Sequence, residues 1–414
     1  MWQQISLETA TELLLSETAP LDETVTLPLN RALGQICAHD IQATVDNPPF
    51  DRSPLDGVAF RASDTDGATD GHPVKLKLVG VVYAGQVLDR EVGAGEAVRI
   101  MTGAAMPIGV DAMLPKEVLK EENGQVFIPR KVGRHENYIF RGEDITPGTV
   151  FLTAGTKLTH AHLGMLATNG QGTVTVYRSP VIGMYCIGDE FSQPDKPLEP
   201  GKIYNSNGIM LTSRLAEYGL PSLPHHVLGD DPESAAREIK SAMDNIDILI
   251  TAGSVSVGDK DIMHEVFDLL GVERYVSRLA FKPGSAFLCG KYQNKWIFSL
   301  SGNPFAALAT MELVVRPVLA KHSRRQGLVT RRVKAILASP LTVGKGGNKR
   351  RFLRGRLVQP TDGGPLTVIL PEGHSSGRVF SLAGCNCLVD INHDINNLPE
   401  QTWVEAIDLR FNDD

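Results

Sequence analysis

The sequence predicts a multi-domain protein in which a central three-layer α/β domain is flanked on both sides by β-rich regions. The chain has 414 residues, which is more than one ordinary hydrophobic core holds. Residues 180–320 alternate between strand and helix patterns, as a mostly parallel sheet covered by helices requires. The segments on either side show short, turn-separated strand patterns. The expected division is 1–177 (linker and β-rich domains), 178–322 (α/β domain) and 323–414 (C-terminal β domain).

The composition indicates a soluble globular protein: 42% of the residues are hydrophobic and 21% are charged. The formal net charge of −7 argues against nucleic acid as the main ligand. No segment reaches the ~18 apolar residues of a membrane span, and no basic-then-apolar signal opens the chain. The five cysteines are odd in number and scattered, which favours a reducing cytoplasm, and Cys385-x-Cys387 fits two small strand residues better than a metal site.

In the central region, short apolar runs rich in β-branched residues predict buried strands at Val181–Cys186, Ile246–Thr251 and Trp296–Leu300. Asp231 and Pro232 suit the cap and the first turn of a helix. The other expected elements of this region are Ile209–Tyr218, Ser222–Leu228, Ile262–Leu270, Tyr275–Phe281, Phe287–Cys289 and Phe305–Ala320.

Outside this region, Ser6 suits the cap of a helix over Leu7–Leu14, and residues 73–130 alternate as β-strands do. A short helix (Leu158–Ala167) and a short strand (Gly170–Val176) precede the central region. The strands expected in the C-terminal region are Val333–Leu337, Phe352–Leu357, Leu366–Ile369, Val379–Leu382, Cys387–Ile391 and Trp403–Leu409.

The segment Gly253–Asp261 joins the predicted strand Ile246–Thr251 to a helical pattern. A strand, a glycine-containing loop and a helix form the unit that binds phosphate in open α/β sheets, because glycines let the backbone approach a ligand and the first helical N–H groups are free. Asp259 and Asp261 indicate a cation as well, since bare carboxylates would repel phosphate. The alternative is a tight turn whose aspartate only caps the helix, and this loop alone does not separate the two.

Two further predicted strands end in loops of the same kind. Val181–Cys186 leads into Ile187-Gly-Asp-Glu190, and Trp296–Leu300 leads into Ser301-Gly-Asn-Pro304. Because the carboxyl ends of parallel strands lie at one edge of a sheet, we expect the three loops to converge. Small residues, acidic side chains and a helix N-terminus together indicate a pocket for a phosphorylated ligand and a divalent cation.

Polar groups also gather outside the central region. The proline-rich loop 47–60 carries more ionisable and hydroxyl groups than a structural turn usually does, namely Asp51, Arg52, Ser53 and Asp56. Loop 101–111 has Thr102 at its first bend, and loop 141–148 holds Glu143 and Asp144; either loop could be a plain turn. The C-terminal region contains a basic cluster that is either a solvated loop or an approach to an anionic substrate, and it consists of Lys345, Lys349, Arg350, Arg351, Arg354 and Arg356.

Taken in chain order, these loops resemble the motifs of the MoeA-type molybdopterin molybdenumtransferases, a family related to the E domain of gephyrin. The matching segments run from one end of the chain to the other. They are Phe50-Asp-x-Ser-x-x-Asp-Gly57, Ile100-x-Thr-Gly-Ala104 with Pro107-x-Gly-x-Asp111, Arg141-Gly-Glu-Asp144, Gly188-Asp-Glu190, Ile203-Tyr-x-Ser-Asn207, Asp230-Asp231-Pro232, Gly253–Asp261, Lys282-Pro-Gly284 and Gly302-Asn-Pro304.

The resemblance implies a molybdopterin-binding central domain and a barrel-like C-terminal domain. It also implies an elongated homodimer whose active site joins the α/β domain of one protomer to the Asp56 and Thr102 loops of the other. The implied activity is molybdenum cofactor biosynthesis in the cytoplasm: molybdate is inserted into adenylylated molybdopterin, AMP is released, and a divalent cation such as Mg²⁺ assists. A molybdopterin adenylyltransferase and recipient molybdoenzymes are further candidate partners, with no nucleic acid and no membrane.

The roles that the resemblance implies agree with the chemistry of the loops. Glu190, Asp259 and Asp261 would serve the cation, and Lys282 would neutralise the charge of the phosphate held by the N–H groups of Gly253 and Gly258. The implied catalytic residues are Glu190, Asp261, Asp56, Asp144 and Lys282. The implied substrate-binding residues are Thr102, Asp230, Gly253, Ser254, Ser256, Gly258, Arg278, Ser285, Gly302 and Asn303.

The chain departs from the family pattern in the pocket. Ser254 replaces a glycine, and Ser285-Ala286 replaces a lysine–proline pair, which removes a charge-assisted contact worth ~1.5–3 kcal/mol beside an anion site. The other departures from the family pattern are three single changes (Ile187 for threonine, Asn205 for aspartate, Ser301 for proline) and one turn. This turn is Ser375-Ser-Gly377 in place of glutamine–glycine–serine.

These departures keep two alternatives to an active transferase open. One is a paralogue that binds or delivers molybdopterin or molybdenum cofactor without inserting the metal. The other is an enzyme like the molybdopterin adenylyltransferases, which share the α/β domain. The two outer regions disfavour this second alternative, because an adenylyltransferase does not need them.

Overall fold

The computed structural model describes residues 4–192, 194–256, 261–342, 349–361 and 363–411. It divides into two compact units. Unit 1 comprises Met1–Val25, Gly34–Ile36 and Val176–Asp414, and unit 2 comprises Thr26–Leu33 and Cys37–Thr175. Unit 1 therefore contains both the α/β domain and the C-terminal β domain, and the boundaries at 177 and 322 stay predictions.

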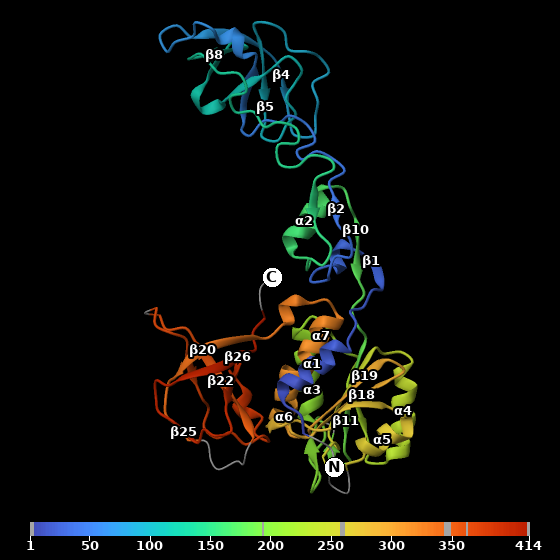
Figure 1. Ribbon diagram of the computed structural model, residues 1–414. Helices are drawn as coiled ribbons and strands as arrows, with labels where there is room; N and C mark the ends of the chain where they lie inside the picture. Colours follow the sequence, from blue (N-terminus) through green and yellow to red (C-terminus); the bar gives the residue numbers. More distant parts are fainter. Residues whose placement is uncertain (1–3, 193, 257–260, 343–348, 362, 412–414) are drawn as a thin grey trace. The chain divides into compact units, whose positions relative to one another are not determined.

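A six-stranded sheet forms the centre of unit 1 (Figure 1). Its strands, in spatial order, are β14 (His226–Leu228), β11 (Ile182–Ile187), β15 (Ile248–Ala252), β19 (Lys295–Leu300), β18 (Phe287–Tyr292) and β16 (Glu273–Val276). The first four strands are parallel, and β18 and β16 are antiparallel additions at one edge. All five residues of β15 are buried, as a strand covered on both faces requires. The predicted mostly parallel sheet is confirmed.

Helices cover both faces of this sheet, which confirms the three-layer arrangement (Figure 1). On one face lie α1 (Leu7–Ser16), α3 (Ser206–Glu217), α6 (Pro304–Thr310), the π-helical turn η4 (Met311–Val315) and α7 (Arg316–His322). On the other lie α4 (Pro232–Met243) and α5 (Met263–Leu270). The predicted caps are present: Ser6 accepts from the N–H of Thr9, and Asp231 accepts from the N–H of Ser234.

The C-terminal β domain is a closed five-stranded barrel, because β22 pairs with both β23 and β24. Its strands are β22 (Arg350–Val358), β23 (Thr367–Ile369), β20 (Arg331–Leu337), β26 (Trp403–Asp408) and β24 (Cys387–Ile391). This confirms the barrel-like expectation. The barrel core holds Cys387 and Val389 from β24, and all five cysteines are free.

Two predicted elements of unit 1 are wrong. The expected strand Val379–Leu382 is a 3₁₀ turn at Phe380–Leu382, and Phe380 is 97% exposed, so this segment contributes no side chain to the barrel core. The expected element Tyr275–Phe281 is divided between two sheets. Its first part belongs to β16, and its end begins β17 (Phe281–Lys282), which pairs with the barrel strand β22.

Unit 2 is built around a six-stranded sheet, as the alternating pattern of residues 73–130 predicts. Its strands are β6 (Ala112–Pro115), β3 (Gly57–Phe60), β5 (Glu96–Ile100), β4 (Val74–Val82), β8 (Gln125–Ile128) and β7 (Lys120–Glu122). The helix α2 (His160–Thr168) begins with a capping box at Thr159. Two short strand pairs are also present: β1 (Thr24–Pro28) with β10 (Thr173–Tyr177), and β2 (Ile41–Gln42) with β9 (Val150–Leu152). Among the helices of the described residues, none is long and apolar enough to cross a membrane.

Candidate active site

The loops after the neighbouring parallel strands β11, β15 and β19 converge at one edge of the sheet, as predicted. Gly253 lies so close to the end of β11 that a Cβ on it would overlap the carbonyl oxygen of Ile187. A Cβ on Gly302 would lie 3.5 Å from the Cα of Gly253. Gly253 has a φ of +107°, a backbone conformation that other residues rarely adopt. Glycine at this position therefore allows two of the loops to meet. Its N–H donates to the Leu300 carbonyl oxygen at 3.0 Å, so the expectation that this N–H holds a phosphate is wrong.

Hydrogen bonds tie these loops to the turn before α4. The Ser254 hydroxyl donates to the Asp230 carboxylate at 2.9 Å. The Asp189 N–H donates to Asp230 at 3.4 Å, and the Asp230 N–H donates back to Asp189 at 3.3 Å. Ser254 has a φ of +50°, so it occupies the left-handed region in which glycine is favoured. Its bond to Asp230 gives this serine a partner at the loop junction. Asp189 was not among the predicted site residues.

The start of α3 is hydrogen-bonded to the loop that follows β19. Asn205 caps the helix by accepting from the Gly208 N–H at 3.0 Å. Asn207 donates from Nδ2 to the carbonyl oxygen of Gly302 at 2.7 Å. Both asparagines are buried, and among the described residues Asn205 Nδ2 and Asn207 Oδ1 have no hydrogen-bond partner. Asn207 was recognised only as part of a motif, because nothing local in the sequence indicates its bond to a residue 95 positions away.

The acidic residues predicted to serve a cation are only partly described. The Glu190 carboxylate lies against Gly188, at the end of β11. Asp261 lies two residues before Met263, the first residue of α5. The Met263 N–H donates to the Ser254 carbonyl oxygen at 3.0 Å, which brings the start of this helix to the same loop. Ser256 is exposed, while Gly258 and Asp259 lie outside the described residues. The described residues alone contain no group of three or more potential metal ligands.

A cationic group adjoins Ser285. The Lys349 ammonium donates to the Ser285 hydroxyl at 3.2 Å, and that hydroxyl donates in turn to the carbonyl oxygen of Phe281. Burial and the nearby charges of Arg278 and Lys282 lower the pKa of Lys349. A lysine of the C-terminal domain thus lies beside Ser285, where the family pattern has its own lysine.

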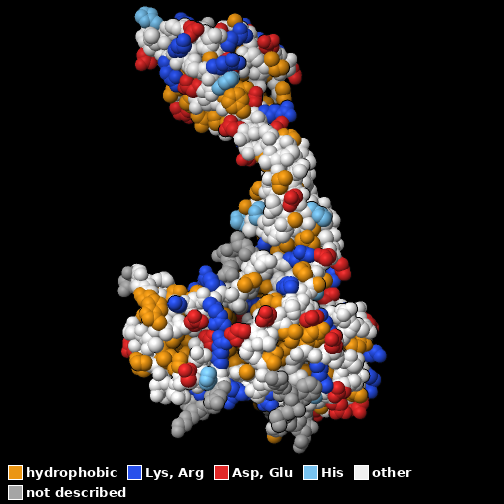
Figure 2. All heavy atoms as spheres, in the orientation of Figure 1, with side chains coloured by type: hydrophobic (Ala, Val, Ile, Leu, Met, Phe, Trp, Pro, Cys, Tyr) orange, Lys and Arg blue, Asp and Glu red, His pale blue; other side chains and the backbone are white. Residues whose placement is uncertain are grey.

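The other members of the predicted basic cluster have different environments. Arg350 pairs with Glu8 and Asp390, so its charge is neutralised. Arg351 and Arg354 are buried, Arg356 is exposed, and Lys345 lies outside the described residues. Figure 2 shows basic and acidic side chains intermixed over the C-terminal strands. The cluster is therefore not a single solvated face, and Lys349 is the member that contacts a predicted site residue.

In unit 2, two predicted site residues form a direct contact. The Asp56 carboxylate accepts from the Thr102 N–H at 2.8 Å and from the Thr102 hydroxyl at 2.7 Å. These two bonds, followed by the charge of Lys116, hold the pKa of Asp56 below its usual value. The third predicted residue, Asp144, accepts from Asn47 at 2.7 Å and lines a cavity of about 360 Å³.

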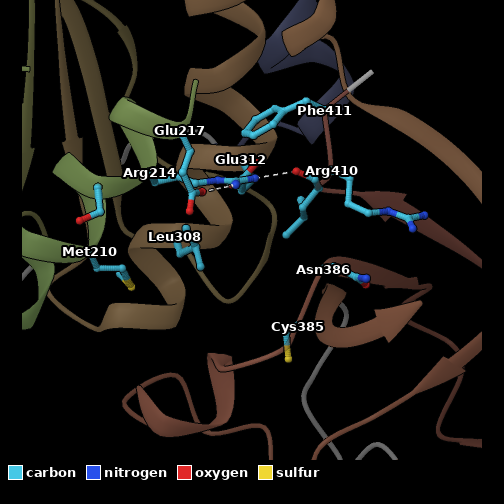
Figure 3. Close-up of a pocket in the computed structure, with 11 residues that line it drawn as sticks. Met210, Arg214, Glu217, Leu308, Glu312, Cys385, Asn386, Arg410 and Phe411 are labelled. Atoms are coloured by element: carbon cyan, nitrogen blue, oxygen red, sulfur yellow. Dashed lines mark hydrogen bonds and ion pairs between the residues drawn. The ribbon is translucent and has the colours of Figure 1, made fainter. Parts of the chain in front are cut away.

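A larger cavity of about 540 Å³ lies between α3, the α6–η4 helical segment and the C-terminal strands (Figure 3). Arg214 lines it, donating to Glu312 at 2.6 Å, to Glu217 at 2.6 Å and to the carbonyl oxygen of Leu409 at 2.6 Å. Glu312 also pairs with the buried Arg316 at 2.9 Å. The guanidinium of Arg214 is thus fully engaged within the protein, which gives this cavity a structural rather than a ligand-binding character.

The protein combines a mostly parallel α/β sheet with converging glycine loops, a small β barrel and a β-rich unit encoded before them. These features define a protein of the molybdopterin-binding class with additional MoeA-type regions. Three family models match the chain: MoeA N-terminal region (domain I and II) at residues 5–170, probable molybdopterin binding domain at 183–321, and MoeA C-terminal region (domain IV) at 334–409. The chain belongs to the MoeA family.

The similarity extends over most of each relative. The molybdopterin molybdenumtransferase of Staphylococcus aureus (strain MSSA476) is 35% identical over 366 residues, which cover 88% of this chain and 86% of that protein. The Bacillus subtilis (strain 168) protein of the same name is 36% identical over 372 residues, covering 89% and 85%. The crystal structure of the molybdopterin biosynthesis MoeA protein from Pyrococcus horikosii superposes with a TM-score of 0.81 at 30% identity, covering 99% of this chain and all of that one.

Proposed function

We propose that this protein is a molybdopterin molybdenumtransferase, an enzyme of molybdenum cofactor biosynthesis that inserts molybdate into adenylylated molybdopterin and releases AMP. One observation carries the proposal: the loops at Gly188, Gly253 and Gly302 converge. Cationic side chains also gather near Ser285, and one of them, Lys349, comes from the C-terminal domain. Close-packed glycine loops suit phosphate, and clustered cations suit an oxyanion. Membership of the MoeA family supports the same activity.

The residue roles follow from this arrangement. Arg278, Lys282 and Lys349 would balance the negative charge of the substrates beside the loops of Gly253 and Gly302. Glu190 and Asp261, with Asp259, have the hard oxygen ligands that suit Mg²⁺, which when bound would stabilise charge on the phosphate oxygens. A cytoplasmic location and transfer to recipient molybdoenzymes remain predictions.

The function is tested by measuring AMP release from adenylylated molybdopterin with and without molybdate and Mg²⁺. Release that requires both would support the transferase, and chelation of the cation should abolish it. Tight binding without turnover would favour the paralogue that delivers molybdopterin. Transfer of AMP from ATP to molybdopterin would favour the adenylyltransferase alternative.

The role of Lys349 gives a specific prediction. Replacing Lys349 with methionine keeps the length of the side chain but removes its charge beside Ser285. The KM for molybdate should rise about tenfold or more, the usual effect of losing a charge-assisted contact. The control is Lys334→Met, because Lys334 is exposed on the barrel strand β20. An equal KM for molybdate in both variants would show that Lys349 does not contribute to molybdate binding.

We further propose that the enzyme is a homodimer whose site combines Asp56 and Thr102 of one protomer with the α/β loops of the other. Mixing an Asp56→Ala variant with an Asp261→Ala variant should then restore AMP release, since each heterodimer would have one intact site. Each variant alone should remain inactive. A mixture that is no more active than the separate variants, despite subunit exchange, would show that the site is built within one protomer.

A further inference from the structure

Asp51 belongs to the proline-rich loop 47–60 of unit 2, and the proposed reaction does not use its carboxylate. An aspartate in a plain turn usually bonds to the backbone two residues further on. The Asp51 carboxylate instead accepts from the Tyr138 hydroxyl at 2.6 Å and from the Arg141 N–H at 2.7 Å, donors that lie 87 and 90 positions away. Both carboxylate oxygens therefore hold one distant segment, residues 138–141.

Tyr138 is suited to remain the donor in this contact. The side chain is half-buried, and burial, followed by the hydrogen bond to Asp51, raises the pKa of Tyr138. The hydroxyl therefore stays protonated at neutral pH. The ring lies beside Phe140, with centroids 5.0 Å apart, and both rings contact His135. Asp51 is thus bonded to a packed aromatic cluster and not to a single exposed ring.

The backbone next to Asp51 lies between two other loops. On one side, the Met106 N–H donates to the Asp51 carbonyl oxygen at 2.9 Å. On the other side, Arg52 and Ile139 exchange two backbone hydrogen bonds of 2.9 and 3.1 Å. Residues 51–53 are therefore the middle segment of three, between 103–106 and 138–141.

Each of these three segments adjoins a predicted site residue. Asp56 follows 51–53, Thr102 precedes 103–106, and Asp144 follows 138–141. Asp56 and Thr102 are joined by their own two hydrogen bonds. The carboxylate of Asp51 connects the segment that leads to Asp56 with the segment that leads to Asp144.

We propose that Asp51 is a positioning residue of the active site: its carboxylate holds the loop that carries Asp144 in a fixed place beside the loops that carry Asp56 and Thr102. All of these residues belong to unit 2, so this arrangement is complete within one compact unit. The kinetic part of this inference rests on the proposed function, but the contact between the loops does not.

The contact is tested first without any substrate, by hydrogen–deuterium exchange of the amides of residues 138–144 in the full-length protein. Asp51→Ala removes both acceptors, so exchange in this segment should accelerate about tenfold or more. The matched control is Asp64→Ala. Asp64 also accepts from a backbone N–H, that of Gly95 at 2.8 Å, but neither residue belongs to the three segments. This control should leave exchange at 138–144 unchanged.

The second readout separates positioning from a need for the charge itself. In Asp51→Ala, kcat/KM for adenylylated molybdopterin should fall about tenfold, because the loop of Asp144 is no longer held in place. Asp51→Asn should stay within about threefold of the unmodified protein, since an amide keeps an acceptor for the Arg141 N–H and can donate to the Tyr138 oxygen. Asp64→Ala should keep the full value of kcat/KM.

A further variant covers the case in which Asp51→Ala does not fold. Tyr138→Phe removes only the hydroxyl donor, and the Arg141 N–H bond to Asp51 remains. Exchange at 138–144 should then accelerate about threefold, with a loss of kcat/KM of similar size.

Unchanged exchange at 138–144 in the folded variants would overturn the proposal, and so would an Asp51→Asn variant as impaired as Asp51→Ala. A kcat/KM in Asp51→Ala equal to that of Asp64→Ala would also overturn it. Accelerated exchange in a protein that shows no AMP release even with Asp51 intact would leave the contact established and place the failure in the proposed function.

Discussion

Replacing Asp261 with alanine should lower molybdate-dependent AMP release roughly a thousandfold, the loss expected when a ligand of a catalytic cation is removed. Asp261 lies two residues before the start of α5, whose first residue, Met263, is hydrogen-bonded to Ser254 at the junction of the strand-end loops. In this position a carboxylate can serve a cation beside the phosphate. The measurement is the rate of AMP release at saturating substrate across a range of Mg²⁺ concentrations.

The control for this prediction is Asp244→Ala, which removes an exposed carboxylate at the end of α4. It should keep the full rate, and both variants should keep the thermal stability of the unmodified protein. A rate in Asp261→Ala within a few-fold of the control would contradict the assigned role of Asp261.

Replacing Glu312 with alanine should lower the free energy of unfolding by ~3–5 kcal/mol, because it leaves the buried Arg316 and the half-buried Arg214 without their shared carboxylate. Glu312 accepts from Arg214 at 2.6 Å (Figure 3). It also accepts from Arg316 at 2.9 Å, and both Glu312 and Arg316 are fully buried. The carboxylate lies in the π-helical turn η4, where α6 leads into α7. The measurement is the midpoint and slope of urea unfolding.

Glu217 offers a matched control, since it pairs with the same Arg214 but its side chain is 59% exposed. Removing it should cost at most ~1 kcal/mol, as for other surface ion pairs. Equal destabilisation by the two substitutions would show that the buried network contributes little more than a surface pair. Because neither residue belongs to the proposed pocket, the KM values of both variants should stay unchanged.

The elements that position the pocket could be predicted because their signals are local. Apolar runs that are buried on both faces specify β11, β15 and β19, and the cap Asp231 with Pro232 specifies the start of α4. Once these strands are known to be parallel, their loops must converge at one edge. The short C-terminal strands have weaker signals: the segment 379–382 is close in length to the real strands β23 and β24, yet it forms a 3₁₀ turn.

The roles of the basic cluster could not be predicted, because they depend on tertiary contacts. Lys349, Arg350 and Arg354 are close in sequence and similar in charge. Yet Lys349 contacts Ser285, Arg350 pairs with Glu8 and Asp390, and Arg354 is buried against α6. Each of these partners is more than 20 residues away in the sequence, so no local pattern distinguishes one member of the cluster from another.

Two of the residues that depart from the family pattern form side-chain hydrogen bonds in the pocket. Ser254 donates to Asp230, and Ser285 accepts from Lys349. The substitution at Ile187, which is buried at the end of β11, has no such structural explanation. The substitutions that first favour a non-catalytic paralogue are thus partly accommodated within the same site, which favours an active enzyme.

The converging loops should perform molybdate insertion. The most direct test is one turnover of the purified protein with adenylylated molybdopterin, molybdate and Mg²⁺, in which AMP and molybdenum cofactor are quantified together. An active transferase should yield both products in equal amounts, and neither without molybdate. AMP that appears without any cofactor, or a bound substrate that stays intact when molybdate is present, would contradict the claim.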